Sequence, residues 1–202
     1  MLPQSRQLGN ITIPPASRAD VEREGLQILT KTELQPGRYQ LRVAVGSQQR
    51  GGSVLLDLDV PDFSKKELTM SGLVLRGPEE PEGIFLPVGD PLEGLGRRGP
   101  TVARVFRTSD VVTVYAEIYE DPGGRPHNIE VKALLRNEAG AVTPVASATV
   151  SSDDLKKTGN VLRVEPQLPL AELPPGRYVF SLEAKSTAGG DTVSRSIPFR
   201  MR

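Results

Sequence analysis

The residue types that most often carry out chemistry are scarce in this chain. Its 202 residues include no Cys and a single His, His127. His127 follows a Gly-Gly-Arg-Pro turn sequence, and no nucleophile pattern accompanies it. General acid–base catalysis needs a partner within hydrogen-bonding reach and a tuned pKa. We therefore interpret His127 as a surface turn residue and predict that the protein is not an enzyme and carries no cofactor.

Metal binding is the next chemistry to consider. The absence of Cys excludes disulfides, thiolate zinc sites and cysteine nucleophiles. Asp57, Asp59 and Asp62 cluster in the way that calcium favours, but they lack the loop and the ligand count of a known calcium motif. We interpret these carboxylates as strand-face charges that discourage aggregation and predict no metal site.

Two aromatic residues could bind a ligand. Tyr115 and Tyr119, with Glu117 between them, share the face of a predicted strand opposite to its apolar row. Exposed aromatic pairs on such faces stack sugars in many carbohydrate-binding modules. They also pack against neighbouring domains, and we favour packing because the chain is only 4% aromatic. A carbohydrate site is therefore the alternative interpretation.

Charge and hydropathy exclude further classes of partner. The 25 basic residues balance 25 acidic residues, which argues against a basic nucleic-acid-binding face. No apolar run approaches the ~20 residues that cross a bilayer, so we predict no membrane insertion. The first residues lack the basic and apolar regions of a signal peptide.

The elements that must position these residues are strands. The chain's 20 Gly and 18 Pro punctuate short segments rich in Val, Leu, Tyr and Thr. Seven predicted strands cover residues 102–106, 111–119, 129–136, 142–150, 160–165, 178–185 and 193–200. Seven strands in about 100 residues are typical of an immunoglobulin-like β-sandwich. We therefore predict an all-β fold.

An internal repeat is the most specific motif. The sequence Glu-Leu-Gln-Pro-Gly-Arg-Tyr at 33–39 recurs with one change at 172–178, 139 residues later. Each copy precedes an alternating strand, a Gly-Gly pair and a final strand. We interpret both copies as tyrosine corners, in which the Tyr hydroxyl bonds to the backbone just upstream. The predicted structural corner residues are Leu34, Pro36, Gly37, Tyr39, Leu173, Pro175, Gly176 and Tyr178.

The repeat divides the chain into unequal parts. Residues 100–202 hold enough strands for a complete sandwich, whereas few elements precede Tyr39: a predicted short helix ending near Gly25 and one strand. We predict a partial fibronectin-like or immunoglobulin-like module over 1–75, with a trailing strand at 68–75. Residues 76–99, with six Gly and four Pro, are the predicted linker.

The stretches 34–45, 52–63 and 68–75 resemble bacterial von Willebrand factor A-related proteins of the kind abundant in Acidobacteria. Residues 104–106, 110–115 and 168–170 are similar to the C-terminal part of that family. The resemblance implies β-sandwich modules behind a metal-binding A domain, in an exported, periplasmic or extracellular protein. The A domain's Asp-x-Ser-x-Ser loop is absent, since Ser151-Ser152-Asp153-Asp154 has another order and is interpreted as a solvated turn.

The combined expectation is a non-catalytic spacer or protein-interaction platform, the tail of a larger exported protein. Its partner would be another protein or an upstream domain of the same polypeptide. A ligand-binding module that uses Tyr115 and Tyr119 remains the alternative function.

Overall fold

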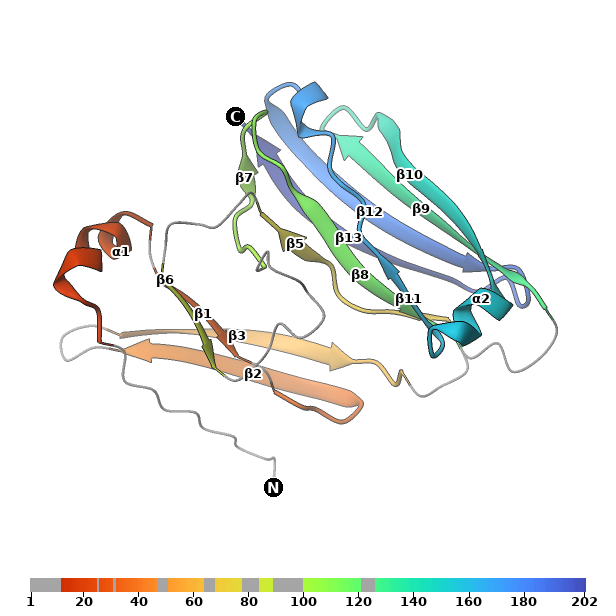
Figure 1. Cartoon of the computed structure of the whole chain (residues 1–202), viewed down its shortest axis with the longest axis horizontal. Coiled ribbons are helices and arrows are strands. Elements are labelled where there is room, and N and C mark those ends of the chain that lie inside the picture. The colour runs from red at the N-terminus through yellow and green to blue at the C-terminus, as the bar shows by residue number, and fades with distance from the viewer. Residues whose placement is uncertain are drawn as a thin grey trace.

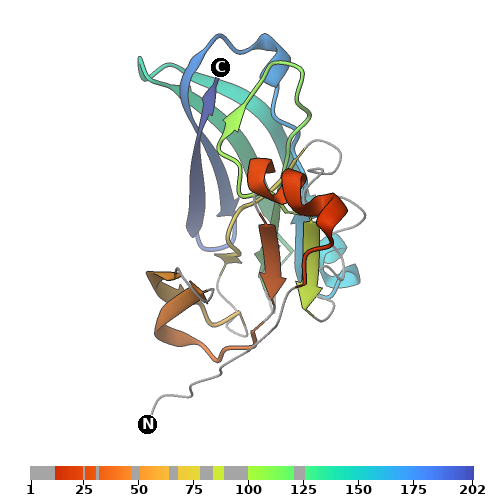
Figure 2. The ribbon, with the colours of Figure 1, turned by 90° about the vertical axis from the view of Figure 1, so that its left-hand side faces the viewer.

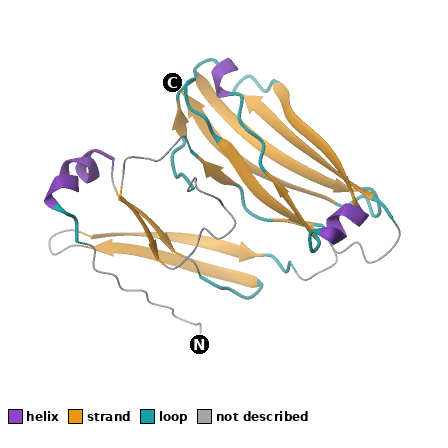
Figure 3. Ribbon diagram, viewed as in Figure 1, coloured by secondary structure: helices purple, strands orange, loops and turns teal. Residues whose placement is uncertain are grey.

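The computed structural model shows a chain built mostly of β-strands with little helix (Figure 3). The structure describes residues 12–24, 26–30, 32–46, 51–63, 68–77, 84–88, 100–120 and 126–202. The helical pieces are η1 (Pro15–Ser17), α1 (Arg18–Glu24), α2 (Ser152–Lys157) and η2 (Leu170–Glu172). The first six strands are β1 (Leu26–Thr30), β2 (Gly37–Gly46), β3 (Gly51–Val60), β4 (Thr69–Met70), β5 (Val74–Arg76) and β6 (Ile84–Val88). The remaining strands are β7 (Val105–Phe106), β8 (Thr113–Tyr119), β9 (Asn128–Asn137), β10 (Val142–Ser151), β11 (Val161–Val164), β12 (Gly176–Ser186) and β13 (Thr192–Met201).

Two sheets from the C-terminal part of the chain enclose one core (Figure 1). One sheet has the order β10-β9-β12-β13-β7, and the other has the order β11-β8-β4, with β5 also paired to β8. The alternation in β12 explains the packing, because Tyr178, Phe180, Leu182 and Ala184 are all buried while the residues between them are not. Each strand predicted between 102 and 200 overlaps a strand of the structure.

The segment 68–77 belongs with these two sheets. We predicted it as the trailing strand of the first module, but β4 and β5 pair antiparallel with β8. Leu68, Met70 and Leu75 are buried in the C-terminal core. The backbone N–H of Thr101 donates to the carbonyl oxygen of Leu75, which ties the segment to the strands that follow. We call residues 68–77 and 100–202 the C-terminal body.

A second correction concerns Ser151-Ser152-Asp153-Asp154. The Ser151 hydroxyl accepts a hydrogen bond from the Asp154 N–H at 3.1 Å, so this segment opens helix α2. Ser152 and Leu155 are buried, so the segment is not the solvated turn of our interpretation. The acidic residues in the first turn of α2 and the basic residues in its last turn both interact favourably with the helix dipole.

The remaining strands form two small pairs outside the C-terminal body (Figures 1 and 2). β1 pairs parallel with β6, which lies in the segment that we predicted as a linker. β2 and β3 pair antiparallel over ten residues, and we call this hairpin the ribbon. The predicted short helix before β1 is present as α1. The other residues of the predicted linker, 78–83 and 89–99, lie outside the described residues.

Candidate functional site

The two copies of the corner motif adopt the same local structure. The Tyr39 hydroxyl donates to the Gln35 carbonyl oxygen at 2.7 Å, and the Tyr178 hydroxyl donates to the Pro174 carbonyl oxygen at 2.9 Å. Both bonds span four residues and are the upstream backbone contacts that a tyrosine corner requires. Each corner therefore starts its hairpin, β2 or β12, in the same way.

The glycine of each corner has a conformational reason. Gly37 has φ +148° and Gly176 has φ +156°, values that L side chains rarely adopt. A Cβ at either position would lie 3.8 Å from Cε2 of the following Tyr ring. That distance is an ordinary van der Waals contact, so the requirement for glycine comes from the backbone angle. Pro36 and Pro175 precede these glycines, and Leu34 and Leu173 are half-buried on the approach to each corner.

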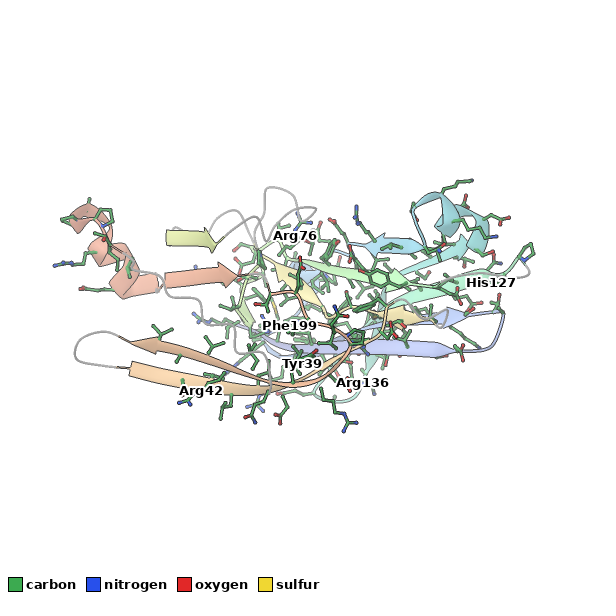
Figure 4. All side chains as sticks on the ribbon, turned by 90° about the horizontal axis from the view of Figure 1, so that it is seen from below. Tyr39, Arg42, Arg76, His127, Arg136 and Phe199 are labelled. Carbon is green, nitrogen blue, oxygen red and sulfur yellow. The ribbon has the colours of Figure 1, made fainter. Side chains whose placement is uncertain are left out.

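The ribbon separates its side chains into an apolar and a mainly polar face. Register pairs Leu41 with Leu56 and Val43 with Val54, and directly opposed residues share a face. The members of the apolar face are Tyr39, Leu41, Val43, Val45, Val54, Leu56, Leu58 and Val60. Figure 4 shows Arg42 on the outer side of the ribbon, so the apolar face is turned toward the layer that holds β1 and β6.

Most side chains of the apolar face are exposed in the described part of the chain. Leu41, Val43, Val45, Val54 and Leu56 retain between 43% and 69% of their accessible surface. Soluble monomers rarely expose contiguous apolar patches above a few hundred Å², and larger patches commonly mark interaction sites. The apolar face of the ribbon is therefore the strongest candidate interaction surface among the described residues.

The mainly polar face carries Asp57 and Asp59, two of the three carboxylates that we considered as calcium ligands and interpreted as strand-face charges. Asp57 accepts from the Gln40 amide at 3.4 Å, and Asp59 lies 4.0 Å from the Arg38 guanidinium. Asp62 lies beyond the end of β3. A shallow hollow of about 470 Å³ runs along this end of the ribbon, lined by Arg38, Tyr39, Gln40, Asp57, Leu58 and Asp59. Among the described residues no group of three or more potential ligands is placed to hold a metal ion.

Tyr115 and Tyr119 converge on one carboxylate. The Tyr115 hydroxyl donates to Glu117 Oε1 at 2.7 Å, and the Tyr119 hydroxyl donates to Glu117 Oε2. Arg163, opposite Glu117 on β11, donates to Oε1 at 3.3 Å. The sequence placed the three β8 residues on one face, and the structure adds the bonds between them. This group, with Arg163, is called the Glu117 cluster below.

The protonation states of the cluster are shifted in opposite directions. Burial, followed by the hydrogen bond to Glu117, raises the pKa of Tyr115 to about 12. The same two causes raise the pKa of Tyr119. Burial alone would raise the pKa of Glu117, but the bonds from the two tyrosines and Arg163 outweigh it and lower this pKa. A carboxylate held ionised by three donors stabilises the sheet surface and is poorly suited to act as a general acid.

The tyrosine rings also bear on the carbohydrate alternative. Tyr115 retains only 8% of its accessible surface, which leaves no open ring face for a sugar. The Tyr119 ring is packed against Phe63, with ring centroids 4.7 Å apart. Phe63 follows the ribbon closely in the chain, so this contact joins the ribbon end to the C-terminal body. These positions match the packing interpretation of the aromatic pair better than sugar stacking.

His127 is not the surface residue that the sequence suggested. Its Nε2 lies 2.9 Å from Glu120 Oε2, and both side chains are only 7% exposed. The Ser152 hydroxyl accepts from the His127 N–H, and the Ser152 N–H donates to the His127 carbonyl oxygen. Our interpretation failed because Glu120 and His127 flank the connection between β8 and β9. Their proximity depends on how the chain passes between the two sheets, which local sequence does not show.

Comparisons with known proteins add little to this geometry. No protein-family profile and no curated protein matches the chain. Solved structures with some likeness include an alkylpurine DNA glycosylase of Pseudomonas fluorescens bound to DNA with an abasic site analogue. It is 12% identical, with a TM-score of 0.36 and coverage of 69% of this chain and 31% of its own.

A family 123 glycoside hydrolase of Clostridium perfringens is 9% identical, with a TM-score of 0.34 and coverage of 65% and 27%. This chain thus spans less than a third of the length of either protein, and values this low assign no function. In the described part of the chain, no helix is long and apolar enough to cross a membrane.

Proposed function

We propose that the protein is a non-catalytic interaction module, in which the C-terminal body is a rigid base and the ribbon presents a surface to a protein partner. One observation carries the proposal. The ribbon has the same corner and the same alternation as β12 and β13, yet its apolar face is open where theirs is core. Exposure of an apolar sheet face of this kind to water is unfavourable, and a partner that covers the face removes this cost.

The finer fold assignment supports this role. We propose that the C-terminal body is an immunoglobulin-like sandwich. Its five-stranded sheet faces the sheet of β11, β8, β4 and β5, and a tyrosine corner opens β12. Sandwiches of this type commonly serve as spacers and binding modules rather than as catalysts, although that is an analogy of fold.

The resemblance to von Willebrand factor A-related proteins supplies the origin that we propose. On that basis the chain is the tail of a larger exported protein, and the partner is either another protein or an upstream domain. The coding sequence upstream of Met1 tests this directly. An in-frame upstream coding region that contains an Asp-x-Ser-x-Ser loop supports this origin. An in-frame stop codon upstream of Met1, with no such loop between the two, contradicts it.

A dye-binding experiment tests whether the apolar face is available. In the variant Leu41→Ser/Val43→Ser/Val54→Ser, we expect 8-anilinonaphthalene-1-sulfonate fluorescence to fall well below that of the wild type. The matched control Gln40→Ser/Arg42→Ser/Asp57→Ser changes the other face of the same strands and keeps the signal. The urea midpoint of both variants, followed by circular dichroism, stays near that of the wild type, because substitutions at exposed sites usually change stability by about 0.5 kcal/mol or less.

Two outcomes contradict the proposal. The wild type could bind no dye, which would mean that the apolar face is covered in solution. Alternatively, the apolar-face variant could lose as much stability as a core variant, which would mean that these side chains belong to a closed core. In either case the ribbon would not be an interaction surface.

A further inference from the structure

The complete copy of the hairpin shows what the incomplete copy lacks. In the C-terminal body β12 pairs with β13 on one edge and with β9 on the other. β9 is antiparallel to β12 and places Leu135, Ala133 and Val131 opposite Phe180, Leu182 and Ala184. Within the described part of the chain, β2 pairs with β3 alone. The strand equivalent to β9 is therefore the missing neighbour of β2.

The repeat also identifies which backbone groups of β2 face the open edge. At the end of β12, the Ser186 N–H donates toward the β13 side, to Asp191, and the Thr187 N–H donates to Asn128 of β9. Odd-numbered residues of β12 thus bond to β9, since the direction alternates along a strand. With the offset of 139 residues, the equivalent groups in β2 belong to Gln40, Arg42 and Ala44. Their side chains lie on the face opposite to Leu41 and Val43.

The charged residue beside each corner indicates what an added strand must carry at its end. In the complete copy, Arg177 lies 3.5 Å from the carboxylate of Glu138, which directly follows β9. Arg38 is the equivalent of Arg177, and its side chain is 91% exposed beside Asp59 at 4.0 Å. An incoming strand that ends in a carboxylate would give Arg38 the contact that Arg177 makes. The open edge thus prefers a partner that is apolar at alternate positions and acidic after its last strand residue.

We propose that the open edge of β2 accepts an antiparallel strand from a partner protein, whose alternate apolar side chains extend the layer of Leu41, Val43 and Val45. This inference rests on the proposed function, because it assumes that the apolar face is a binding surface. Such strand addition takes affinity from main-chain hydrogen bonds and specificity from alternate side chains. It would supply the edge partner that β9 supplies to β12.

A peptide with the sequence of residues 128–138 is the probe, because it carries both the alternation of β9 and the final carboxylate. We expect a fluorescein-labelled form to bind the full chain saturably, as measured by anisotropy. A peptide of the same composition with the alternation interrupted is the control and binds at least about tenfold more weakly, because alternate pockets supply the specificity.

Two variants locate the binding at the β2 edge. Ala44→Pro removes one N–H that faces the open edge and leaves the hydrogen bonds between β2 and β3 in place, so we expect it to weaken peptide binding about tenfold. The control Ala44→Ser keeps this N–H and binds the peptide like the wild type. Arg38→Glu weakens binding severalfold, and a peptide with Lys in place of its final Glu restores it. Circular dichroism verifies that each variant keeps its strand content.

The outcomes separate the two proposals. Peptide binding that is unaffected by Ala44→Pro overturns the inference, since the peptide then binds elsewhere, for example in exchange with β9. If no peptide binds while the dye still binds the apolar face, the strand inference fails and the proposed function stands. A concentration-dependent dimer in sedimentation that Val43→Asp abolishes also overturns the inference, because a second copy then covers the face.

Discussion

The two corner hairpins are close to a controlled comparison within one chain. Six of seven corner residues agree, the hydroxyl bond spans four residues in both, and both glycines have positive φ. Their burial nevertheless differs. Phe180 and Leu182 are fully buried, whereas Leu41 and Val43, at the equivalent positions, are exposed. The local motif thus determines how a hairpin begins, and its neighbours determine whether the apolar face becomes a core.

Aromatic side chains and a third strand surround β12 in the C-terminal body. Tyr178 stacks on Phe199, with ring centroids 5.6 Å apart, and Phe199 packs in turn against Phe106 of β7. β9 adds a further strand beside β12, and the sheet that contains β8 covers the pair. β2 has no equivalent of β9 within the described residues. The same apolar alternation therefore contributes more to the free energy of unfolding in β12 than in β2.

The largest test of this comparison is the pair Phe180→Ala and Leu41→Ala. Phe180 is fully buried, and its truncation should lower the free energy of unfolding by about 3–5 kcal/mol, through lost transfer energy and a cavity. Leu41 is 43% exposed, and its truncation should cost about 1 kcal/mol or less. Urea unfolding followed by circular dichroism measures both. Equal losses would show that the ribbon face is as closed as the core.

The corner bonds provide the next test. Tyr178→Phe removes the donor to the Pro174 carbonyl oxygen from a buried tyrosine, in a part-buried hydrogen bond, and should cost about 1–3 kcal/mol. Tyr39→Phe removes the equivalent bond at an exposed site, where water can replace the donor, and should cost about 0.5 kcal/mol. A Tyr178→Phe change within experimental error would contradict the importance of the corner in the C-terminal body.

The pH dependence of stability tests the Glu117 cluster, which lies on the body near the ribbon end. The pKa of Glu117 is lowered on folding, so its contribution is present above its ordinary value of 4.5 and is lost as pH falls through the lowered pKa. The pKa of Tyr115 is raised from 10.0 to about 12, so its contribution is present below pH 10 and is lost as pH rises toward 12.

Glu117→Gln should therefore flatten both limbs of the stability profile. At neutral pH we expect a loss of about 1–2 kcal/mol, because three donors lose a charged acceptor. The control Glu165→Gln removes a carboxylate paired with Arg76 on the same body and keeps most of the tyrosine limb, because Glu165 is the smallest of the causes that raise the pKa of Tyr115. An unchanged alkaline limb in Glu117→Gln would contradict the assigned bonds.

The smallest expected effect concerns the contact between the ribbon end and the body. Phe63→Ala removes the ring packed against Tyr119, and we expect a loss of about 0.5–1.5 kcal/mol. Phe63→Leu keeps an apolar contact and should recover part of it. After Phe63→Ala, backbone amide hydrogens of β3 should exchange faster than those of β13 in the same variant protein. Equal protection of the two strands would mean that this contact does not hold the ribbon.

Sequence reasoning predicted most strands because their signal is local. β8, β9 and β12 alternate with period two, and turn residues bound them, so their positions follow from side-chain direction alone. The tyrosine corners were predictable for the same reason, since the bond spans four residues. The all-β class, the short helix α1 and the shared face of Tyr115, Glu117 and Tyr119 also needed no distant contact.

The errors involve contacts that depend on how the strands and sheets are arranged in space. The segment 68–77 follows the ribbon in the chain but pairs with β8, about 40 to 50 residues away. His127 occurs in a turn sequence, yet the crossing of the chain between the sheets brings it to Glu120. Segment α2 reads as polar and solvated because only its Ser152 and Leu155 enter the core. Each case required knowledge of which strand lies beside which.

The sequence by itself determined most of the strands and the two corners, because φ preferences, alternation and hydrogen bonds over four residues are local properties. Only the tertiary structure decided which hairpin became a core. Burial depends on the strands that close over an apolar face. The chain closes them over β12 and β13, whereas among the described residues β2 has β3 as its single neighbour. The same apolar alternation is therefore core at 178–184 and largely exposed at 39–45.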